Sequence, residues 1–488
     1  MNTKIVKIVN KYKSIPEPVK ASLWFTICSV VQKGIGFITT PFFARLMTTS
    51  QFGKYSVYLS WESILIIFAT LNLASSVYNN AMIKYEDKID EVTSSFLGLS
   101  TVTTAVLFVI YILFSNQINN ATGLNTVITL AMFVQMFLEP AYQFWATKQR
   151  FNYKYKKLIL ITLFIAVGSP ALGIIAVIMS EYKTEARVIS YVFVTAIVGI
   201  VFYVRTMAKG KKFFDSVYWK YALAFNLPLL PHYLAQKILN QSDKIMIDKY
   251  MDSTKAAFYS VAFTIASVLQ IVITAVNSSF VPYIYTSIKQ KENNKIKNVS
   301  FLILICISIM CLFVMLLGPE LVYIVGGKQY MEAIWCIPSI AASIYFIFLY
   351  CMFANVEFYY EKTKFMMVGS IIIAILNVIF NYVGIVNFGY ISVSYVTLIC
   401  YILFSIVHYL YYKKIIVSNG MDSLYNEKMI FIYSIIFLVI SFGILISYMF
   451  NYIRYICLVV LFFILLFKWK DILNSLKVLS KKSDDKMR

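Results

Sequence analysis

Residues 158–180 read LILITLFIAVGSPALGIIAVIMS, a stretch without a charged side chain. A helix needs about 20 mostly apolar residues to cross a bilayer, so this stretch predicts a transmembrane helix. Similar stretches fill most of the chain, and they predict an all-α polytopic membrane protein with about 14 transmembrane helices and no soluble domain. The candidate spans are 19–43, 55–79, 93–115, 124–147, 158–180, 187–206, 219–247, 256–283, 299–318, 331–358, 365–386, 390–412, 429–450 and 453–469.

The charge pattern predicts the orientation of these spans. The chain of 488 residues has a net charge of +21, which in a soluble protein would suggest a nucleic-acid partner. Here Lys and Arg lie between the apolar stretches, mostly in every second gap, as in 148–157, 209–220 and 289–297, whereas 115–125 and 385–390 carry no charge. Because positive residues favour the cytoplasmic side, we exclude nucleic acid and expect both termini in the cytoplasm.

An internal repeat predicts the organisation into lobes. A shift of 204 residues places Gln32-Lys33 on Gln236-Lys237 and Tyr55-Ser56-Val57 on Tyr259-Ser260-Val261. Six spans separate the copies, so the two halves keep the same orientation and form a parallel repeat. We therefore expect two six-helix lobes and two C-terminal helices. The predicted domains are 1–210 (spans 1–6), 211–415 (spans 7–12) and 416–488 (two extra spans and a basic cytoplasmic tail).

Two lysines lie at membrane depth. Lys33 stands about 13 residues into the first span, roughly 19 Å along a helix, and Lys237 is similarly deep in the seventh. Ionisable groups at this depth usually face a bundle interior or an aqueous cavity. The alternative is snorkelling to the interface, but the repeat superimposes the two lysines and favours a shared cationic cavity.

Span seven is the most polar span. At about 100° per residue, four of its polar residues fall within an arc of about 80° and the rest fill the adjoining sector. The alternative is that Asp243, Lys244 and Asp248 lie near the outer interface, with Lys244 paired to Asp248. The arc holds His232, Gln236, Asn240 and Asp243, and the adjoining sector holds Lys237, Gln241, Lys244 and Asp248.

Carboxylates and prolines mark further candidate sites. We expect Glu62 and Glu139, in spans two and four, to form an internal ion pair with Lys33 or Arg45, or else to carry a proton. Glu357 and His408 are expected at the cytoplasmic interface. Five prolines are candidate hinges, with ordinary kinks as the alternative. These are Pro41, Pro140, Pro170, Pro228 and Pro231.

Sequence motifs for catalysis are lacking. The chain has no GxxxxGK[ST] phosphate loop, no HExxH and no Cys–His cluster, so we expect no ATP hydrolysis, no metal, no cofactor and no catalytic residue. The longest candidate outer loop, 318–331, is too short for a catalytic domain. A transporter rather than an enzyme is the leading class.

Two segments carry a family resemblance. Residues 240–251, NQSDKIMIDKYM, followed by AAFYSVA at 256–262, and TPFFARLM at 40–47 with FGKYS at 52–56, resemble the Wzx-type polysaccharide repeat-unit flippases. These belong to the multidrug/oligosaccharidyl-lipid/polysaccharide exporter superfamily. Phe258 departs from the pattern, since relatives often carry Gly there.

The resemblance implies a function. Such a protein would move an undecaprenyl-pyrophosphate-linked oligosaccharide across the bacterial cytoplasmic (inner) membrane for O-antigen, capsule or exopolysaccharide assembly, by alternating access of a cationic central cavity. Lys33 and Lys237, with Arg45 and Lys244, would neutralise the pyrophosphate. Membrane lipids, a coupling ion, and polymerase and chain-length proteins of the pathway would be its partners.

Two other functions remain open at this point. One is a cation-coupled multidrug exporter of the same fold, which would use Glu62, Glu139 and Asp243, although mid-membrane lysines would repel cationic drugs. The other is a membrane polymerase or ligase of the same glycans, against which the lack of a long outer loop counts.

Overall fold

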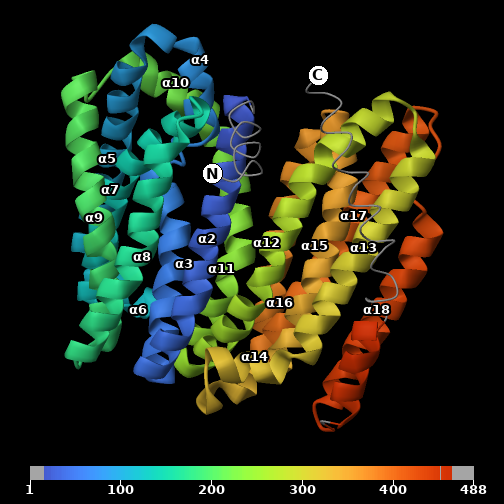
Figure 1. Ribbon diagram of the computed structural model, residues 1–488. Coiled ribbons are helices and arrows are strands. Elements are labelled where there is room, and N and C mark those ends of the chain that lie inside the picture. The colour runs from blue at the N-terminus through green and yellow to red at the C-terminus, as the bar shows by residue number, and fades with distance from the viewer. Residues whose placement is uncertain (1–15, 451, 464–488) are drawn as a thin grey trace, which may run out of the picture. The chain divides into compact units, whose positions relative to one another are not determined.

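The computed structural model describes residues 16–450 and 452–463, and all regular structure in these residues is helical (Figure 1). The first half comprises α2 (Glu17–Leu46), α3 (Thr49–Thr70), α4 (Ser76–Lys84), η1 (Glu86–Lys88), α5 (Ile89–Leu113), α6 (Ser115–Thr122), α7 (Thr126–Phe151), α8 (Tyr155–Met179), α9 (Lys183–Gly210), α10 (Ser216–Asn226) and η2 (Leu227–Leu229). The second comprises α11 (Leu230–Tyr250), α12 (Ser253–Lys289), α13 (Asn293–Leu316), α14 (Gly318–Val325), η3 (Lys328–Cys336), α15 (Ile337–Tyr359), α16 (Thr363–Phe388), α17 (Ile391–Ser418) and α18 (Glu427–Ser447).

Eleven helical stretches of the described residues are long and apolar enough to cross a membrane. They include α8, which covers the stretch 158–180, and they confirm an all-α polytopic membrane protein. The three remaining predicted spans coincide with α3, with α10 and α11, and with the shorter apolar helix Tyr452–Phe463. The end of the last predicted span, 464–469, lies outside the described residues.

Two predicted spans are interrupted. The expected helix 55–79 starts earlier, at Thr49, and ends at Thr70, because Leu71 and Asn72 take left-handed φ values of 49° and 51°. Few residues other than Gly adopt this conformation, and none continues a helix in it. The predicted span 219–247 divides into α10 and α11 at the 3-10 turn η2, which contains Pro228.

The helix boundaries support the internal repeat. The first helix of each copy ends at Leu46 in α2 and at Tyr250 in α11, and the next begins at Thr49 in α3 and at Ser253 in α12. Both pairs are 204 residues apart, the same shift that aligns Lys33 with Lys237. The two lysines therefore occupy equivalent positions in two equivalent helical hairpins.

Contacts group the chain into two compact units. Unit 1 comprises residues 1–47 and 58–234, and unit 2 comprises 48–57 and 235–488, so the first turns of α3 belong to unit 2. The division into domains 1–210, 211–415 and 416–488 stays a prediction.

Unit 1 is built around α9, which packs against α5, α7 and α8, and α2 packs against α8. An aromatic group joins α4, α5 and α7, where the ring centroids of Tyr78 and Phe144 lie 5.0 Å apart. Gly210 ends α9 directly against the start of α5, where an added Cβ would collide with the carbonyl of Asp90. Only a residue without a side chain allows this close approach.

Unit 2 is built around α15, which packs against α12, α13, α17 and α18, while α16 packs against α17. The rings of Tyr345 and Phe437 stack at 4.4 Å between α15 and α18, and the Tyr345 hydroxyl bonds Ser434 at 2.8 Å. Polar groups on α15 therefore lie between closely packed helices, where they meet partners from neighbouring helices.

Candidate functional site

A buried glutamine organises the polar cluster of unit 1. Gln135 on α7 is 1% exposed. Its amide nitrogen lies 2.8 Å from Oε2 of Glu139, one turn along the helix, and 3.2 Å from Oε1 of Glu62 on α3. Its carbonyl oxygen accepts a 2.8 Å hydrogen bond from the hydroxyl of Tyr58. One neutral amide therefore holds two carboxylates from different helices.

Water can reach this cluster. Glu139 also accepts a 3.0 Å hydrogen bond from Gln143, and both line a cavity of about 90 Å³ together with Gln32, Tyr191 and Thr162. A cavity of that size with polar walls holds a few water molecules. Glu139 at the wall of this cavity can exchange a proton or a cation with such water, and Glu62 shares the amide of Gln135 with it; this is the chemistry expected of a coupling site.

A buried carboxylate organises the polar cluster of unit 2. Asp243 on α11 is 2% exposed. Its Oδ1 accepts a 2.7 Å hydrogen bond from Asn381 on α16, and its Oδ2 accepts hydrogen bonds from Thr397 of α17, at 3.1 Å, and from the hydroxyl of Tyr259 on α12. Four helices converge on one carboxyl group.

Two asparagines extend this cluster. The Oδ1 of Asn377 accepts hydrogen bonds from Asn381 and Ser242, both at 3.1 Å. Within the described residues the second polar atoms of the two amides, Asn381 Oδ1 and Asn377 Nδ2, have no hydrogen-bond partner. Because an amide turned by 180° exchanges its oxygen and nitrogen, the cluster can offer several oxygens to a hard monovalent cation. The described residues contain no group of three or more His, Cys, Asp or Glu that would suit a transition metal.

The predicted cationic residues lie on two helices. Lys33 and Arg45 are exposed on α2, in unit 1, and Lys237 is exposed on α11, in unit 2. Lys244 is half-buried, with Nζ 4.9 Å above the centroid of the Phe263 ring. The role of these four residues in binding pyrophosphate stays a prediction.

The other polar residues predicted on span seven separate into three settings. His232 is half-buried, and Gln236 and Asn240 are exposed one turn apart, with Asn240 donating to the Gln236 carbonyl at 2.7 Å. Asp248 pairs with Lys54 at 3.2 Å and accepts a 2.5 Å hydrogen bond from Ser253. Asp248 thus joins α11 to the starts of α3 and α12, and the alternative pair with Lys244 is not the one formed.

A further pair lies buried between two helices. Glu357 on α15 and His408 on α17 are both 0% exposed, with Oε1 and Nδ1 2.7 Å apart. Their expected place at the cytoplasmic interface stays a prediction. Pro41, Pro140 and Pro170 lie inside α2, α7 and α8, Pro228 lies in η2 and Pro231 near the start of α11; their action as hinges stays a prediction.

Sequence reasoning missed the residues that hold the carboxylates. These residues are neutral and, unlike the polar residues of span seven, stand in strongly apolar stretches: Gln135, Asn377, Asn381 and Thr397. A signal was present, because Gln135 precedes Glu139 by four residues and Asn377 precedes Asn381 by four. This spacing places two polar groups on one face of an apolar helix.

Comparisons with known proteins define the class. The chain is similar to the lipid II flippase MurJ in an inward closed conformation, with a TM-score of 0.67, 14% identity, and 92% of this chain and 100% of that chain covered. It is also similar to an inward-facing multidrug resistance MATE family transporter, with a TM-score of 0.59, 14% identity, and 82% and 98% covered. The chain therefore has the fold that these two solved structures share.

The family follows from the sequence. The model of the polysaccharide biosynthesis protein family matches residues 19–288, more than half of the chain, and the chain belongs to this family. Protein 1 of the Lsg locus of Haemophilus influenzae is 22% identical over 372 residues, covering 74% of this chain and 89% of that protein. An uncharacterized membrane protein of the same organism is 22% identical over 359 residues, covering 71% and 85%. The resemblance to polysaccharide flippases is confirmed.

Proposed function

We propose that this protein moves undecaprenyl-pyrophosphate-linked oligosaccharide repeat units from the cytoplasmic to the outer leaflet of the bacterial cytoplasmic membrane. The supporting observation is the match to the polysaccharide biosynthesis family over residues 19–288, which contain both Lys33 and Lys237. The family and the fold are those of transporters. The solved neighbour named as a lipid II flippase supports a substrate of the same chemical kind, a glycan on a lipid carrier.

The physical task explains the residues. Sugar hydroxyls cost several kcal/mol each when buried without partners, and an ion costs far more. A pyrophosphate therefore needs cations and a wet surface while its lipid tail stays in the bilayer. Lys33 and Lys237 are exposed at equivalent positions of the two hairpins, and Arg45 lies near the end of the first hairpin's α2. In the proposed mechanism these cations face a cavity that opens alternately to either side.

The two buried clusters suit the coupling of this movement to an ion. The carboxylates Glu62 and Glu139 share the amide of Gln135, and Asp243 lies among the neutral oxygens of unit 2. Each cluster joins several helices, so gain or loss of a cation or proton would change how those helices pack. We propose these clusters as the coupling sites and the four cationic side chains as the substrate contacts.

A complementation assay tests the substrate contacts. In a strain that lacks its own repeat-unit flippase, the wild-type chain should restore surface polysaccharide. We expect Lys33→Ala with Lys237→Ala to insert in the membrane and to leave lipid-linked units accumulated inside, since two of the four proposed cationic contacts to the pyrophosphate would be lost. Lys33→Arg with Lys237→Arg is the matched control and should retain function. Full surface polysaccharide from the double alanine variant would contradict the mechanism.

A multidrug exporter is the second candidate function. The observation in its favour is the fold shared with multidrug transporters, together with buried carboxylates that could attract a cationic drug. Growth of a drug-sensitive strain in cationic dyes, with and without the chain, distinguishes the two functions. Under the flippase proposal, expression should not change dye resistance.

A further inference from the structure

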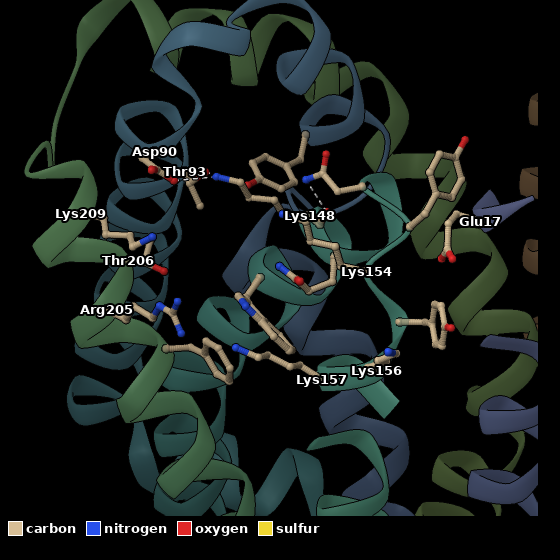
Figure 2. Close-up of a pocket in the computed structure, with 17 residues that line it drawn as sticks. Glu17, Asp90, Thr93, Lys148, Lys154, Lys156, Lys157, Arg205, Thr206 and Lys209 are labelled. Atoms are coloured by element: carbon tan, nitrogen blue, oxygen red, sulfur yellow. Dashed lines mark hydrogen bonds and ion pairs between the residues drawn. The ribbon is translucent and has the colours of Figure 1, made fainter. Parts of the chain in front are cut away.

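Unit 1 contains a cavity of about 650 Å³ that is separate from its carboxylate cluster (Figure 2). Its wall comes from the starts of α2, α5 and α8, the ends of α7 and α9, the turn 152–154, and Tyr78 of α4. The positive-inside pattern predicts that this end of unit 1 faces the cytoplasm. On that prediction, we expect the cavity at the level of lipid headgroups.

The wall of the cavity is strongly cationic. Six cations line it, against the two carboxylates Glu17 and Asp90. Lys148 pairs with Asp90 at 2.6 Å, and in the residues that the structure describes no carboxylate pairs with the other five cations. The six cations are Lys148, Lys154, Lys156, Lys157, Arg205 and Lys209.

The cationic groups are held by ordered backbone. The turn between α7 and α8 is closed by a 2.8 Å hydrogen bond from the amide of Lys154 to the carbonyl of Gln149, and Tyr153 takes a left-handed φ of 55°. Beside the turn, Trp145 stacks on Phe202 at 4.3 Å, which joins α7 to α9. Figure 2 shows the side chain of Lys157, from α8, extending toward that of Arg205, from α9. Positive charges from separate helices thus face one hollow.

Apolar surface leads away from this hollow along both helices. On α8, Leu160 and Phe164 follow Lys157 on one helical face and are 71% and 55% exposed. On α9, Val201 and Ile197 precede Arg205 at intervals of four residues and are 58% and 44% exposed. Residues spaced by three and four share a helix face, so each cation stands at the end of a lipid-facing apolar stripe.

We propose that this pocket binds the phosphate headgroup of a lipid whose chains lie along α8 and α9. Basic pockets between transmembrane helices at the headgroup level bind anionic lipid headgroups. Snorkelling alone accounts for single lysines beside an apolar stripe; it gives no reason for unpaired cations from three segments to surround one cavity. Two lipids share the required chemistry, namely an anionic membrane phospholipid and a polyprenyl pyrophosphate.

Lipid binding by the purified full-length chain tests this site. The chain is delipidated in detergent and titrated with phosphatidylglycerol, undecaprenyl pyrophosphate, phosphatidylcholine or inorganic phosphate, and bound species are counted by intact-protein mass spectrometry. At least one anionic lipid should bind about tenfold more tightly than phosphatidylcholine, because each nearby Lys or Arg contributes to the attraction. The tighter of the two anionic lipids identifies the source of the headgroup. Inorganic phosphate that binds as tightly as either lipid would overturn the lipid assignment.

A pair of double variants locates the site. Lys157→Gln with Arg205→Gln should weaken anionic lipid binding about tenfold, and Lys154→Gln with Lys156→Gln should act in the same direction. The matched control, Lys88→Gln with Lys211→Gln, removes the same charge from exposed residues near this end that do not line the pocket. Equal weakening in the control, or no weakening in the first two, would overturn the proposal. Equal melting temperatures show that all variants remain folded.

Discussion

The side-chain amide of Asn381 donates a 2.7 Å hydrogen bond to Oδ1 of Asp243 and joins α16 to α11 inside unit 2. An unpaired polar group costs several kcal/mol in hydrocarbon, so each of these buried residues needs a partner. Their contact gives one to both. It also means that a change of charge at Asp243 acts directly on the packing of two helices.

Two substitutions of Asp243 should separate what its hydrogen bonds contribute to folding stability from what its charge contributes to transport. Asp243→Ala removes the acceptor that Asn381, Thr397 and Tyr259 share. Asn381 keeps its bond to Asn377 and Thr397 keeps its bond to the carbonyl of Val393, so the loss falls mainly on the hydroxyl of Tyr259. At about 1–3 kcal/mol for an unpaired buried group, the variant should have a lower melting temperature. Asp243→Asn keeps the shape, and Asn381 can turn its amide to match, so the variant should stay folded and lose transport. If Asp243→Asn transports at the wild-type rate, the charge has no role in coupling.

The same variants test cation binding. We expect Na⁺, compared with choline at equal ionic strength, to raise the melting temperature of the wild-type chain, because a ligand that binds only the folded state stabilises it. Asp243→Asn should lose this response. A wild-type melting temperature that is equal in both salts would leave a proton as the only candidate ligand of this cluster.

Glu139 should be needed for transport more than for folding. Glu139→Gln removes the charge and keeps hydrogen-bonding groups beside Gln135 and Gln143. We therefore expect normal membrane levels and a fall in surface polysaccharide of about a hundredfold, the lower end of the usual scale for loss of a proton-transfer group. Glu181→Gln, at an exposed residue of the same unit, is the control and should have no effect. Equal transport by both variants would exclude Glu139 from coupling.

The pair of Glu357 and His408 should act as a unit in stability. Removing one partner of a buried hydrogen-bonded pair leaves the other unsatisfied, at about 1–3 kcal/mol, whereas replacing both by apolar groups of similar shape is often nearly neutral. We therefore expect Glu357→Leu and His408→Leu to lower the melting temperature separately and the double variant to recover much of the loss. Additive losses in the double variant would show that the two residues are not coupled.

Asp215 should stabilise α10 in a pH-dependent way. Backbone amides of Tyr218 and Val217, aided by Lys212, hold the pKa of Asp215 below its usual value by hydrogen bonding to the carboxylate. A lowered folded-state pKa gives stability that is present above the unfolded pKa of about 3.9 and is lost as pH falls through the folded value.

Variants at Asp215 test the direction of this pH dependence. Asp215→Ala removes the helix cap and should cost about 1 kcal/mol at neutral pH. The difference in melting temperature from the wild type should shrink below about pH 4. Asp215→Asn keeps a neutral cap and should lower the melting temperature less than alanine does. A wild-type advantage over alanine that grew on acidification would contradict the assigned pKa shift.

The sequence by itself determined the class of fold and much of its order. Apolar length alone predicted the helix at 158–180, observed as Tyr155–Met179, because a bilayer imposes the same minimum on every span. The repeat of 204 residues likewise anticipated that Leu46 and Tyr250 end equivalent helices. The predicted helix boundaries were wrong where the local backbone conformation sets them, as at Leu71 and Asn72. A hydropathy pattern does not reveal a left-handed turn.

Only the tertiary structure decided which polar groups meet. Helical spacing placed Asp243 on a polar face of span seven, but it could not show that its partners, Asn381 and Thr397, come from residues 138 and 154 positions away. Glu357 and His408 were similarly invisible as a pair. Periodicity reports which face of a helix is polar. The partner of that face depends on how helices pack, and distant side chains with complementary hydrogen-bonding groups determine it.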